Sequence, residues 1–376
     1  MAASKIENAP WVKLGDYIER SMVNNSDLKY GTEFIEGVNS NGEFCKTKAD
    51  LLDINLKPYK LVNNGDFVYN PSRFNIGSIA YRTTGFCIVS HLYVVFRLNE
   101  LGKEKINPLY LYMYIYRDEF FRMITYLNFG SQRPEFNFFE LSDIKIPLPS
   151  IETQNEIVAV YNGLKELAEE NEKLLEPLSK SCQAFIVDCK MKYPKKRLGD
   201  LIAIDEKINS ENRNLEFLGI NRDKTFMPSV ATTEGLDKSK YKVISKGKFV
   251  FSGMQTGRDV CIRFGLYNET VDGLVSPAYT TYSIVDKNIL PEYLLMNFKR
   301  SEMDRLGWFL SDSSVRSNLD FDRFHDIQIP IPPIQIQQKI VDLYNCYEEC
   351  KRIAKEAREK ISNLCPALVQ KAAHTY

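Results

Sequence analysis

Four polar segments of this chain carry Arg, Asn, Gln, Ser or Thr side chains whose hydrogen-bonding groups could contact a ligand, the bases of a nucleic acid among them. Base readout needs Arg, Lys, Asn or Gln side chains that a rigid frame delivers into a groove. The candidates follow strand-like runs or lie in polar loops, and they are Asn70, Arg73, Asn75, Ser131, Gln132, Arg133, Gln255, Thr256, Arg258, Ser314 and Arg316. The alternative is that they are solvated loop residues or contacts to phosphate.

Catalytic motifs are missing from the sequence. An adenine methyltransferase needs a Gly-rich cofactor loop and an Asn/Asp-Pro-Pro-aromatic motif, but the chain has no Gly-x-Gly, and Asn70-Pro71-Ser72 lacks the second proline. It has no Gly-x-x-x-x-Gly-Lys phosphate loop either. The Glu-x-Lys pattern of a metal-dependent nuclease occurs only at residues 349–351, inside a helical pattern. We therefore expect no catalytic residue, no cofactor and no enzyme activity.

Cysteine and histidine are too scattered to predict a metal site. The eight cysteines include no Cys-x-x-Cys pair, and there are three histidines. We expect buried, reduced thiols. Trp11 and Trp308 are predicted to lie in the core, and Lys57 and Lys60 to lie on the surface or against phosphate.

The charge and hydropathy limit the class of protein. The formal net charge is +0, which argues against a free-standing nonspecific DNA binder but not against a specific reader whose charge is locally arranged. No apolar run is long enough to cross a bilayer, and the first residues lack the apolar core of a signal peptide. We expect a cytoplasmic protein.

The sequence repeats itself once. Residues 143–149 (DIKIPLP) return as residues 326–332 (DIQIPIP), and residues 13–16 (KLGD) return as residues 197–200 (RLGD). Gln154 returns as Gln337, at the same offset of 183 residues as the first pair. A constant offset over such a long span would not arise by chance, so the chain consists of two copies of one unit.

Each copy has a mixed part and a helical part. Residues 1–150 and 193–333 contain β-branched and aromatic runs separated by Gly, Asn, Pro and Ser, and Pro108 and Pro291 mark helix starts. Residues 151–192 and 334–376 each predict a long helix that begins sharply after a Pro-rich strand. The predicted fold class is α+β, with two tandem mixed α/β domains, each followed by a long helix.

Apolar residues at alternating steps of three and four form a heptad seam on both helices. The seam positions are Ile157, Tyr161, Leu164, Leu175, Leu178, Ile340, Tyr344, Tyr347, Ile361 and Leu368. Phe185 continues the first seam, whereas Lys351 and Arg358 interrupt the second. We expect the two helices to pair as an antiparallel coiled coil about 60 Å long. The alternative is that each helix packs separately on its own domain.

The doubled module resembles the specificity (S) subunits of type I restriction-modification systems. Each recognition domain of that family ends in a pattern like Gly-Ser-x-x-Pro, then Ile-x-Ile-Pro-Leu-Pro and a helix that bears a glutamine near its start. The first copy carries Gly130-Ser131-Gln132-Arg133-Pro134, IKIPLP at 144–149 and Gln154. The second carries IQIPIP at 327–332 and Gln337, but residues 311–316 replace the Gly-Ser motif. The resemblance covers essentially the whole chain.

The resemblance implies a non-catalytic subunit that reads a bipartite site in double-stranded DNA. Residues 1–150 and 193–333 would be target-recognition domains 1 and 2, and the helices would set the unread spacer between the two half-sites. Two copies of a methyltransferase subunit would bind, and restriction subunits could join them. Methylation and cleavage, with S-adenosylmethionine, ATP and magnesium, would belong to these partners.

Two other functions stay open from the sequence. The chain could serve a type II-like restriction-modification enzyme, since that difference lies in the partner. It could also be an interaction scaffold whose coiled coil joins two protein-binding domains, which the neutral charge suits. Salt-dependent binding to duplex DNA would separate a DNA reader from a scaffold.

Overall fold

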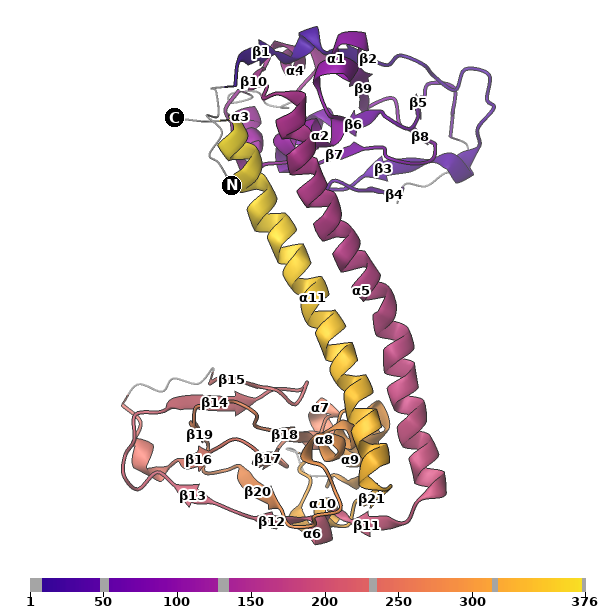
Figure 1. Ribbon diagram of the computed structural model, residues 1–376. Helices are drawn as coiled ribbons and strands as arrows, with labels where there is room; N and C mark the ends of the chain where they lie inside the picture. The colour runs from indigo at the N-terminus through magenta and orange to yellow at the C-terminus, as the bar shows by residue number, and fades with distance from the viewer. Residues whose placement is uncertain (1–8, 48–53, 128–134, 230–234, 313–316, 374–376) are drawn as a thin grey trace. The chain divides into compact units, whose positions relative to one another are not determined.

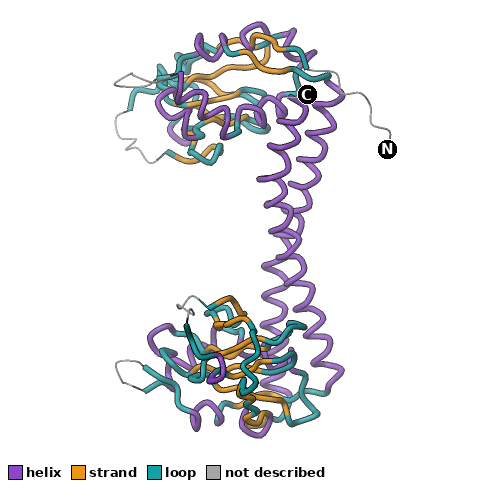
Figure 2. The backbone as a smooth tube through the Cα atoms, turned by 90° about the vertical axis from the view of Figure 1, so that its left-hand side faces the viewer, coloured by secondary structure: helices purple, strands orange, loops and turns teal. Residues whose placement is uncertain are grey.

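The computed structural model describes residues 9–47, 54–127, 135–229, 235–312 and 317–373. The chain forms two compact units, Met1–Glu170 with Ile353–Tyr376, and Asn171–Arg352. Two long helices, α5 (Ile151–Lys192) and α11 (Ile334–Ala373), each contribute residues to both units. Figure 2 shows helices and strands intermixed within each unit, as the mixed domain prediction requires.

The first unit is built on an antiparallel sheet with the order β2-β9-β6-β7. Its strands are β2 (Ile18–Arg20), β9 (Val94–Leu98), β6 (Phe67–Tyr69) and β7 (Ile79–Tyr81). Shorter pairs join β5 (Lys60–Val62) to β8 (Cys87–Val89) and β3 (Glu36–Val38) to β4 (Phe44–Lys46). Every side chain of β6 is buried, so this strand is the centre of the domain.

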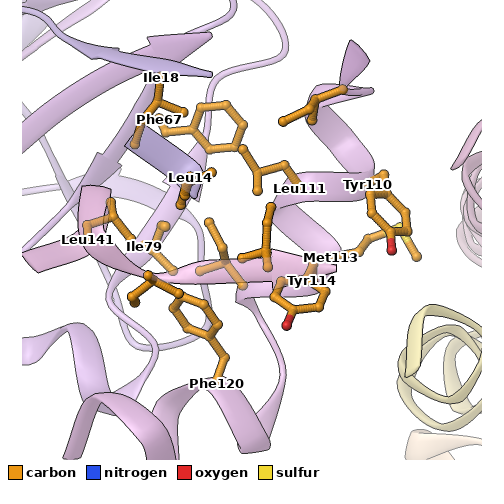
Figure 3. Close-up of a cluster of buried hydrophobic side chains, with 14 of the residues drawn as sticks. Leu14, Ile18, Phe67, Ile79, Tyr110, Leu111, Met113, Tyr114, Phe120 and Leu141 are labelled. Atoms are coloured by element: carbon orange, nitrogen blue, oxygen red, sulfur yellow. The ribbon is translucent and has the colours of Figure 1, made fainter. Parts of the chain in front are cut away.

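Short helices cover one side of this sheet and close the core. They are α1 (Glu100–Lys105), α2 (Pro108–Ile115), α3 (Asp118–Leu127) and α4 (Phe138–Asp143). Asn107 caps α2 by accepting from the backbone N–H of Leu109, and Pro108 occupies its first turn, as predicted. Figure 3 shows Leu111 of α2 and Phe120 of α3 in the same apolar cluster as Phe67 of β6.

The second unit repeats this plan with a larger second sheet. One sheet has the order β12-β20-β17-β18, from β12 (Ile202–Ile204), β20 (Thr280–Ile284), β17 (Phe249–Ser252) and β18 (Arg263–Leu266). The other has the order β13-β16-β19-β14-β15, from β13 (Lys207–Ile208), β16 (Lys242–Ile244), β19 (Gly273–Val275), β14 (Glu216–Ile220) and β15 (Phe226–Pro228). The helices are α6 (Leu198–Leu201), α7 (Thr256–Asp259), α8 (Pro291–Phe298), α9 (Ser301–Leu310) and α10 (Phe321–His325).

The repeated sequence motifs close each domain in the same way. In the first unit β1 (Trp11–Lys13) pairs antiparallel with β10 (Lys145–Pro147), and in the second β11 (Lys195–Arg197) pairs antiparallel with β21 (Gln328–Pro330). An ion pair flanks each two-stranded ribbon, Lys13 with Asp143 and Arg197 with Asp326. The predicted tandem repeat is therefore confirmed.

The long helices pack against each other in antiparallel fashion, as predicted. Within the first unit, Ile157 near the start of α5 shares an apolar cluster with Cys365 and Val369 near the end of α11. Within the second unit, Cys182 and Ile186 of α5 share a cluster with Ile340 near the start of α11.

The predicted seam positions of the two helices are buried or partly exposed. Ile157 and Ile340 are buried, and the positions of intermediate exposure are Tyr161, Leu164, Leu175, Leu178, Tyr344, Tyr347, Ile361 and Leu368. The predicted seam was wrong at Phe185, which is 52% exposed, because the fourth residue after Cys182, Ile186, turns inward instead. In α11, Ala357 is buried beside the exposed Arg358, so the arginine does not interrupt the packing.

Two further sequence predictions were wrong. Trp11 and Trp308 are 55% and 57% exposed, because Trp11 lies on a two-stranded ribbon and Trp308 lies off the face of α9 that buries Met303 and Gly307. Cys45 and Cys346 are also exposed rather than buried. Across the described parts of the chain, none of the helices combines the length and apolar character needed to span a bilayer.

Candidate nucleic-acid interface

In the first domain three of the candidate readers, Asn70, Arg73 and Asn75, lie on a single turn between β6 and β7. The turn is a 3-10 helix, Pro71–Ile76, and the side chain of Asn70 caps it by accepting from the backbone N–H of Ser72 at 3.1 Å. Phe74 is fully buried and anchors the turn, while Arg73 points outward and is exposed. Asn75 is partly exposed, and Gly77 ends the turn at φ 92°, in the left-handed region that favours glycine.

In the second domain the equivalent connection, between β17 and β18, is longer and strained. Tyr69 pairs with Ile79 across the first connection, whereas Phe251 pairs with Phe264, three residues further on. The extra length forms helix α7, which is flanked by Gln255 at φ 61° and Val260 at φ 48°. A left-handed β-branched residue is a true backbone outlier, and such strain gathers at functional sites.

The candidate residues on α7 differ in their access to a ligand. Arg258 is exposed and Gln255 is partly exposed. Thr256 is 1% exposed, and its hydroxyl donates to the carbonyl of Gly253 at 3.0 Å. Thr256 therefore holds the turn, and we do not include it among the residues proposed to touch DNA.

Three arginines contact Asp259 beside this turn, two at its carboxylate and one at its backbone carbonyl. Asp259 accepts from Nε of Arg258 at 2.9 Å and pairs with Nη2 of Arg263 at 2.5 Å. Arg222 donates from Nη2 to the backbone carbonyl of Asp259 at 2.9 Å. The hydrogen bond from Arg258 is the main reason that the pKa of Asp259 lies below its ordinary value. Three guanidinium groups thus gather around Asp259, although the formal net charge of the whole chain is +0.

The second pair of predicted loops lies outside the described residues. Ser131, Gln132, Arg133, Ser314 and Arg316 all fall there. The residues that follow each loop are described, however. In the first domain the backbone N–H of Phe136 donates to the carbonyl of Pro71 at 3.1 Å.

The second domain makes the equivalent connection more tightly. Gly257 N–H donates to Ser317 at 2.9 Å, and Leu319 N–H donates to Gly253 at 2.9 Å. Gly253 permits this approach because a Cβ there would lie 2.1 Å from the carbonyl oxygen of Leu319. In both domains the end of the second loop thus packs against the first candidate turn.

One predicted surface lysine is buried. Lys60 is 7% exposed and donates from Nζ to the carbonyl of Tyr93 at 2.5 Å, and burial is the main reason that its pKa lies below the usual value. Lys242 stands at the matching place in the second domain, where it contacts the carbonyl of Tyr279 and the carboxylate of Glu206. These lysines support the sheets and are unavailable to phosphate. Lys57 is exposed, as predicted.

Sequence reasoning missed Arg222 and Arg263. Arg263 starts β18, directly after the candidate turn, so its position was available as a signal. Arg222 lies in the turn between β14 and β15, and only folding brings it to Asp259. Exposed aromatic residues at equivalent helix ends, Tyr126 and Phe309, also flank the two undescribed loops. Among the residues that the structure describes, no cluster of His, Cys, Asp or Glu could hold a metal ion.

Comparison with known proteins also finds two copies of one module in the chain. The model of the family described as "Type I restriction modification DNA specificity domain" matches residues 12–176 and again residues 191–363. No curated protein matches the chain by sequence.

Two solved structures are similar over nearly the whole chain. The S subunit of a type I restriction-modification system from M. genitalium is 13% identical, with a TM-score of 0.59 over 100% of this chain and 99% of that one. The HsdS subunit from Thermoanaerobacter tengcongensis is 17% identical, with a TM-score of 0.45 over 96% of each chain. The first of these likenesses shows a shared fold.

Proposed function

This chain belongs to the type I restriction-modification DNA specificity family, and we propose that it directs methyltransferase subunits to a bipartite site in double-stranded DNA. The observation that carries this proposal is the doubling of the module. The family's domain matches twice, and each unit presents a polar turn at the same place, between its two equivalent central strands. Each domain would read one half of the site.

We assign the recognition domains to residues 1–150 and 193–333. Arg73 and Asn75 with the cap residue Asn70 would contact DNA in the first, and Gln255 and Arg258 in the second. The undescribed loops with Ser131, Gln132, Arg133, Ser314 and Arg316 would add to these surfaces, because their described ends pack on the same turns. Residues 151–192 and 334–376 would set the unread spacer, since an α-helix is stiff and its length is fixed by its residue count.

Methylation and cleavage would be carried out by partner subunits, and this chain would supply recognition without chemistry of its own. A docking face for such partners is suggested by a second apolar stripe on α5. Val160, Leu167 and Leu174 follow each other at heptad spacing and are 42%, 43% and 50% exposed. A third helix packs against a stripe of this kind, so we assign it to helices of a methyltransferase subunit, with restriction subunits joining the assembly. Such a complex would act on DNA in the cytoplasm.

The local charge supports DNA over a protein ligand for these turns. Neutral net charge suits a scaffold, but Arg222, Arg258 and Arg263 concentrate positive charge at the turn where base-reading residues were predicted. Phosphate contacts release counterions, so the logarithm of the binding constant falls with the logarithm of the salt concentration by about 0.9 for each phosphate neutralised.

The test is the salt dependence of duplex binding by this chain in complex with its methyltransferase. We expect a steep negative slope, and Arg222→Ala should make it shallower by about one phosphate contact. Binding that is absent, or independent of salt, would favour the scaffold. A specificity subunit of a type II-like enzyme would bind in the same manner and would be distinguished by the partner that does the cutting.

A further inference from the structure

We propose that Arg258 reads a guanine in the half-site bound by the second domain, and that Asp259 is the positioning residue that orients Arg258 for this contact. The inference rests on the proposed DNA-reading function. It names one base and one pair of residues, and both can be tested separately from that function.

The guanidinium of Arg258 is held at one edge and open at the other. Its Nε donates to Asp259 at 2.9 Å and its Nη2 donates to Oε1 of Gln255 at 2.5 Å. An arginine carries five N–H donors, so three remain, two of them on Nη1. Guanine presents two acceptors, O6 and N7, in the major groove, and an arginine fork meets both. The side chain is 59% exposed, which leaves this free edge accessible.

The carboxylate of Asp259 is itself held in place, so it does not move with the side chain of Arg258. Its side chain is 14% exposed and is shared with Arg263, whose side chain is 21% exposed. Arg222 fixes the backbone carbonyl of the same residue. An exposed arginine normally loses considerable side-chain entropy when it binds. Here the carboxylate has already restricted Arg258 before DNA arrives.

The backbone of the turn is held in a conformation that a free chain avoids. Gln255 and Val260, on either side of α7, both have positive φ. The turn keeps this strain because Ser317 and Leu319 bond to Gly257 and Gly253. Strain of this kind persists only where the surroundings over-determine it. The result is a rigid support for Arg258, which recognition of a single base requires.

The remaining arginines and the first domain lack this arrangement. Arg222 reaches a backbone carbonyl, and it suits a phosphate contact that carries no sequence information. Arg73 of the first domain is exposed, and its side chain has no hydrogen bond or ion pair within the described ranges. We therefore assign guanine recognition, by an arginine that a carboxylate holds in place, to the second half-site alone.

The experiment maps methylated adenines across the genome of a host that makes this chain with its methyltransferase. The variants are Arg258→Ala, Arg258→Lys and Asp259→Asn, and the control is Lys287→Ala, at an exposed residue in the connection between β20 and α8. Wild type should give a split motif with a guanine in one half. Arg258→Ala should reduce selectivity for that guanine about 5- to 150-fold, which corresponds to the discrimination of one bidentate contact. Arg258→Lys should also reduce this selectivity, because an ammonium group lacks the planar guanidinium fork that Asp259 orients.

Asp259→Asn should reduce selectivity for the same guanine and leave the other half of the motif intact. A general loss of folding would not have this selective effect. Lys287→Ala should leave both the level of methylation and the motif unchanged. The inference is overturned if Arg258→Ala keeps full selectivity at every base, or if neither half contains a guanine. Unchanged selectivity in Asp259→Asn would overturn the positioning role. A wild-type complex that yields no motif would instead overturn the proposed function itself.

Discussion

The side-chain amides of Gln154 and Gln337 make the same three hydrogen bonds in the two halves of the chain. Gln154 accepts from Asn107 N–H at 2.9 Å and donates to the carbonyls of Lys105 and Pro149. Gln337 accepts from Leu290 N–H at 2.8 Å and donates to the carbonyls of Asn288 and Pro332. Both are 0% exposed. Each glutamine thereby ties the first turn of a long helix to the loop before a domain helix.

Removing either amide should destabilise the full-length chain. Gln154→Ala or Gln337→Ala leaves one buried N–H and two buried carbonyls without that partner, so each should lower the free energy of unfolding by about 1–3 kcal/mol. Chemical denaturation measures this change. Gln338→Ala is the matched control, because the side chain of Gln338 is exposed, and it should cost no more than about 0.5 kcal/mol. Equal unfolding midpoints for Gln337→Ala and Gln338→Ala would contradict the account.

The exposed arginine of the first domain should matter for DNA and not for folding. Arg73→Ala should weaken binding of the first half-site by about 1–3 kcal/mol if Arg73 contacts a base, with stability changed by less than about 0.5 kcal/mol. Competition binding with the mapped site and thermal unfolding measure the two effects.

Arg82→Ala is the matched control for Arg73→Ala, because Arg82 is an arginine of the same domain with a structural role. Arg82 pairs with Glu36 at 2.6 Å and donates to the carbonyl of Phe86, and its side chain is 12% exposed. Its loss should lower stability by about 1–3 kcal/mol while the recognised bases stay the same. The assignment of Arg73 fails if Arg73→Ala binds DNA as wild type does.

Thiol reactivity should follow burial. Cys45 and Cys346 are exposed, whereas Cys87 is buried, and burial raises the pKa of the Cys87 thiol to about 12. At pH 8 a thiol with that pKa is thiolate in only about one molecule in ten thousand, so Cys87 should not react until the protein unfolds. Mass spectrometry after timed alkylation measures the order of labelling. Rapid labelling of Cys87 in a Cys45→Ser, Cys346→Ser variant would contradict the packing of this domain.

The helix pair should determine the gap between the half-sites. Deleting one heptad from the middle of each helix, residues 168–174 and 350–356, removes about 10 Å of helix. At about 3.4 Å per base pair, the unread gap should shorten by about three base pairs while both halves of the motif persist. A variant in which the same residues are replaced by another heptad of equal length is the control. An unchanged gap in the deletion variant would show that the helices do not set the spacing.

The architecture could be predicted because local and repeated sequence patterns indicate it. Residues 143–149 and 326–332 match each other directly, and the apolar spacing from Ile157 to Leu178 depends only on helix geometry. Pro108 and Pro291 mark helix starts through their own backbone restriction. Each of these signals is contained within a few turns of the chain.

The details of the candidate site depend on contacts between distant segments, which the sequence does not display. Arg222 meets Asp259 across 37 residues, and Lys60 is buried because β5 lies beside the backbone of Tyr93, 33 residues away. Phe185 and Ile186 are equally apolar neighbours, and the partner helix decides which one is buried. Thr256 was predicted from its position in the sequence to contact DNA, but its hydroxyl donates a hydrogen bond to the backbone carbonyl of Gly253.

The most direct test of the central claim is a genome-wide map of methylated adenine in a host that makes this chain with its neighbouring methyltransferase, compared with the methyltransferase alone. The account predicts a split motif, two short defined halves around a fixed unread gap, that appears only when this chain is present. Methylation without such a motif, in cells where the complex assembles, would contradict it.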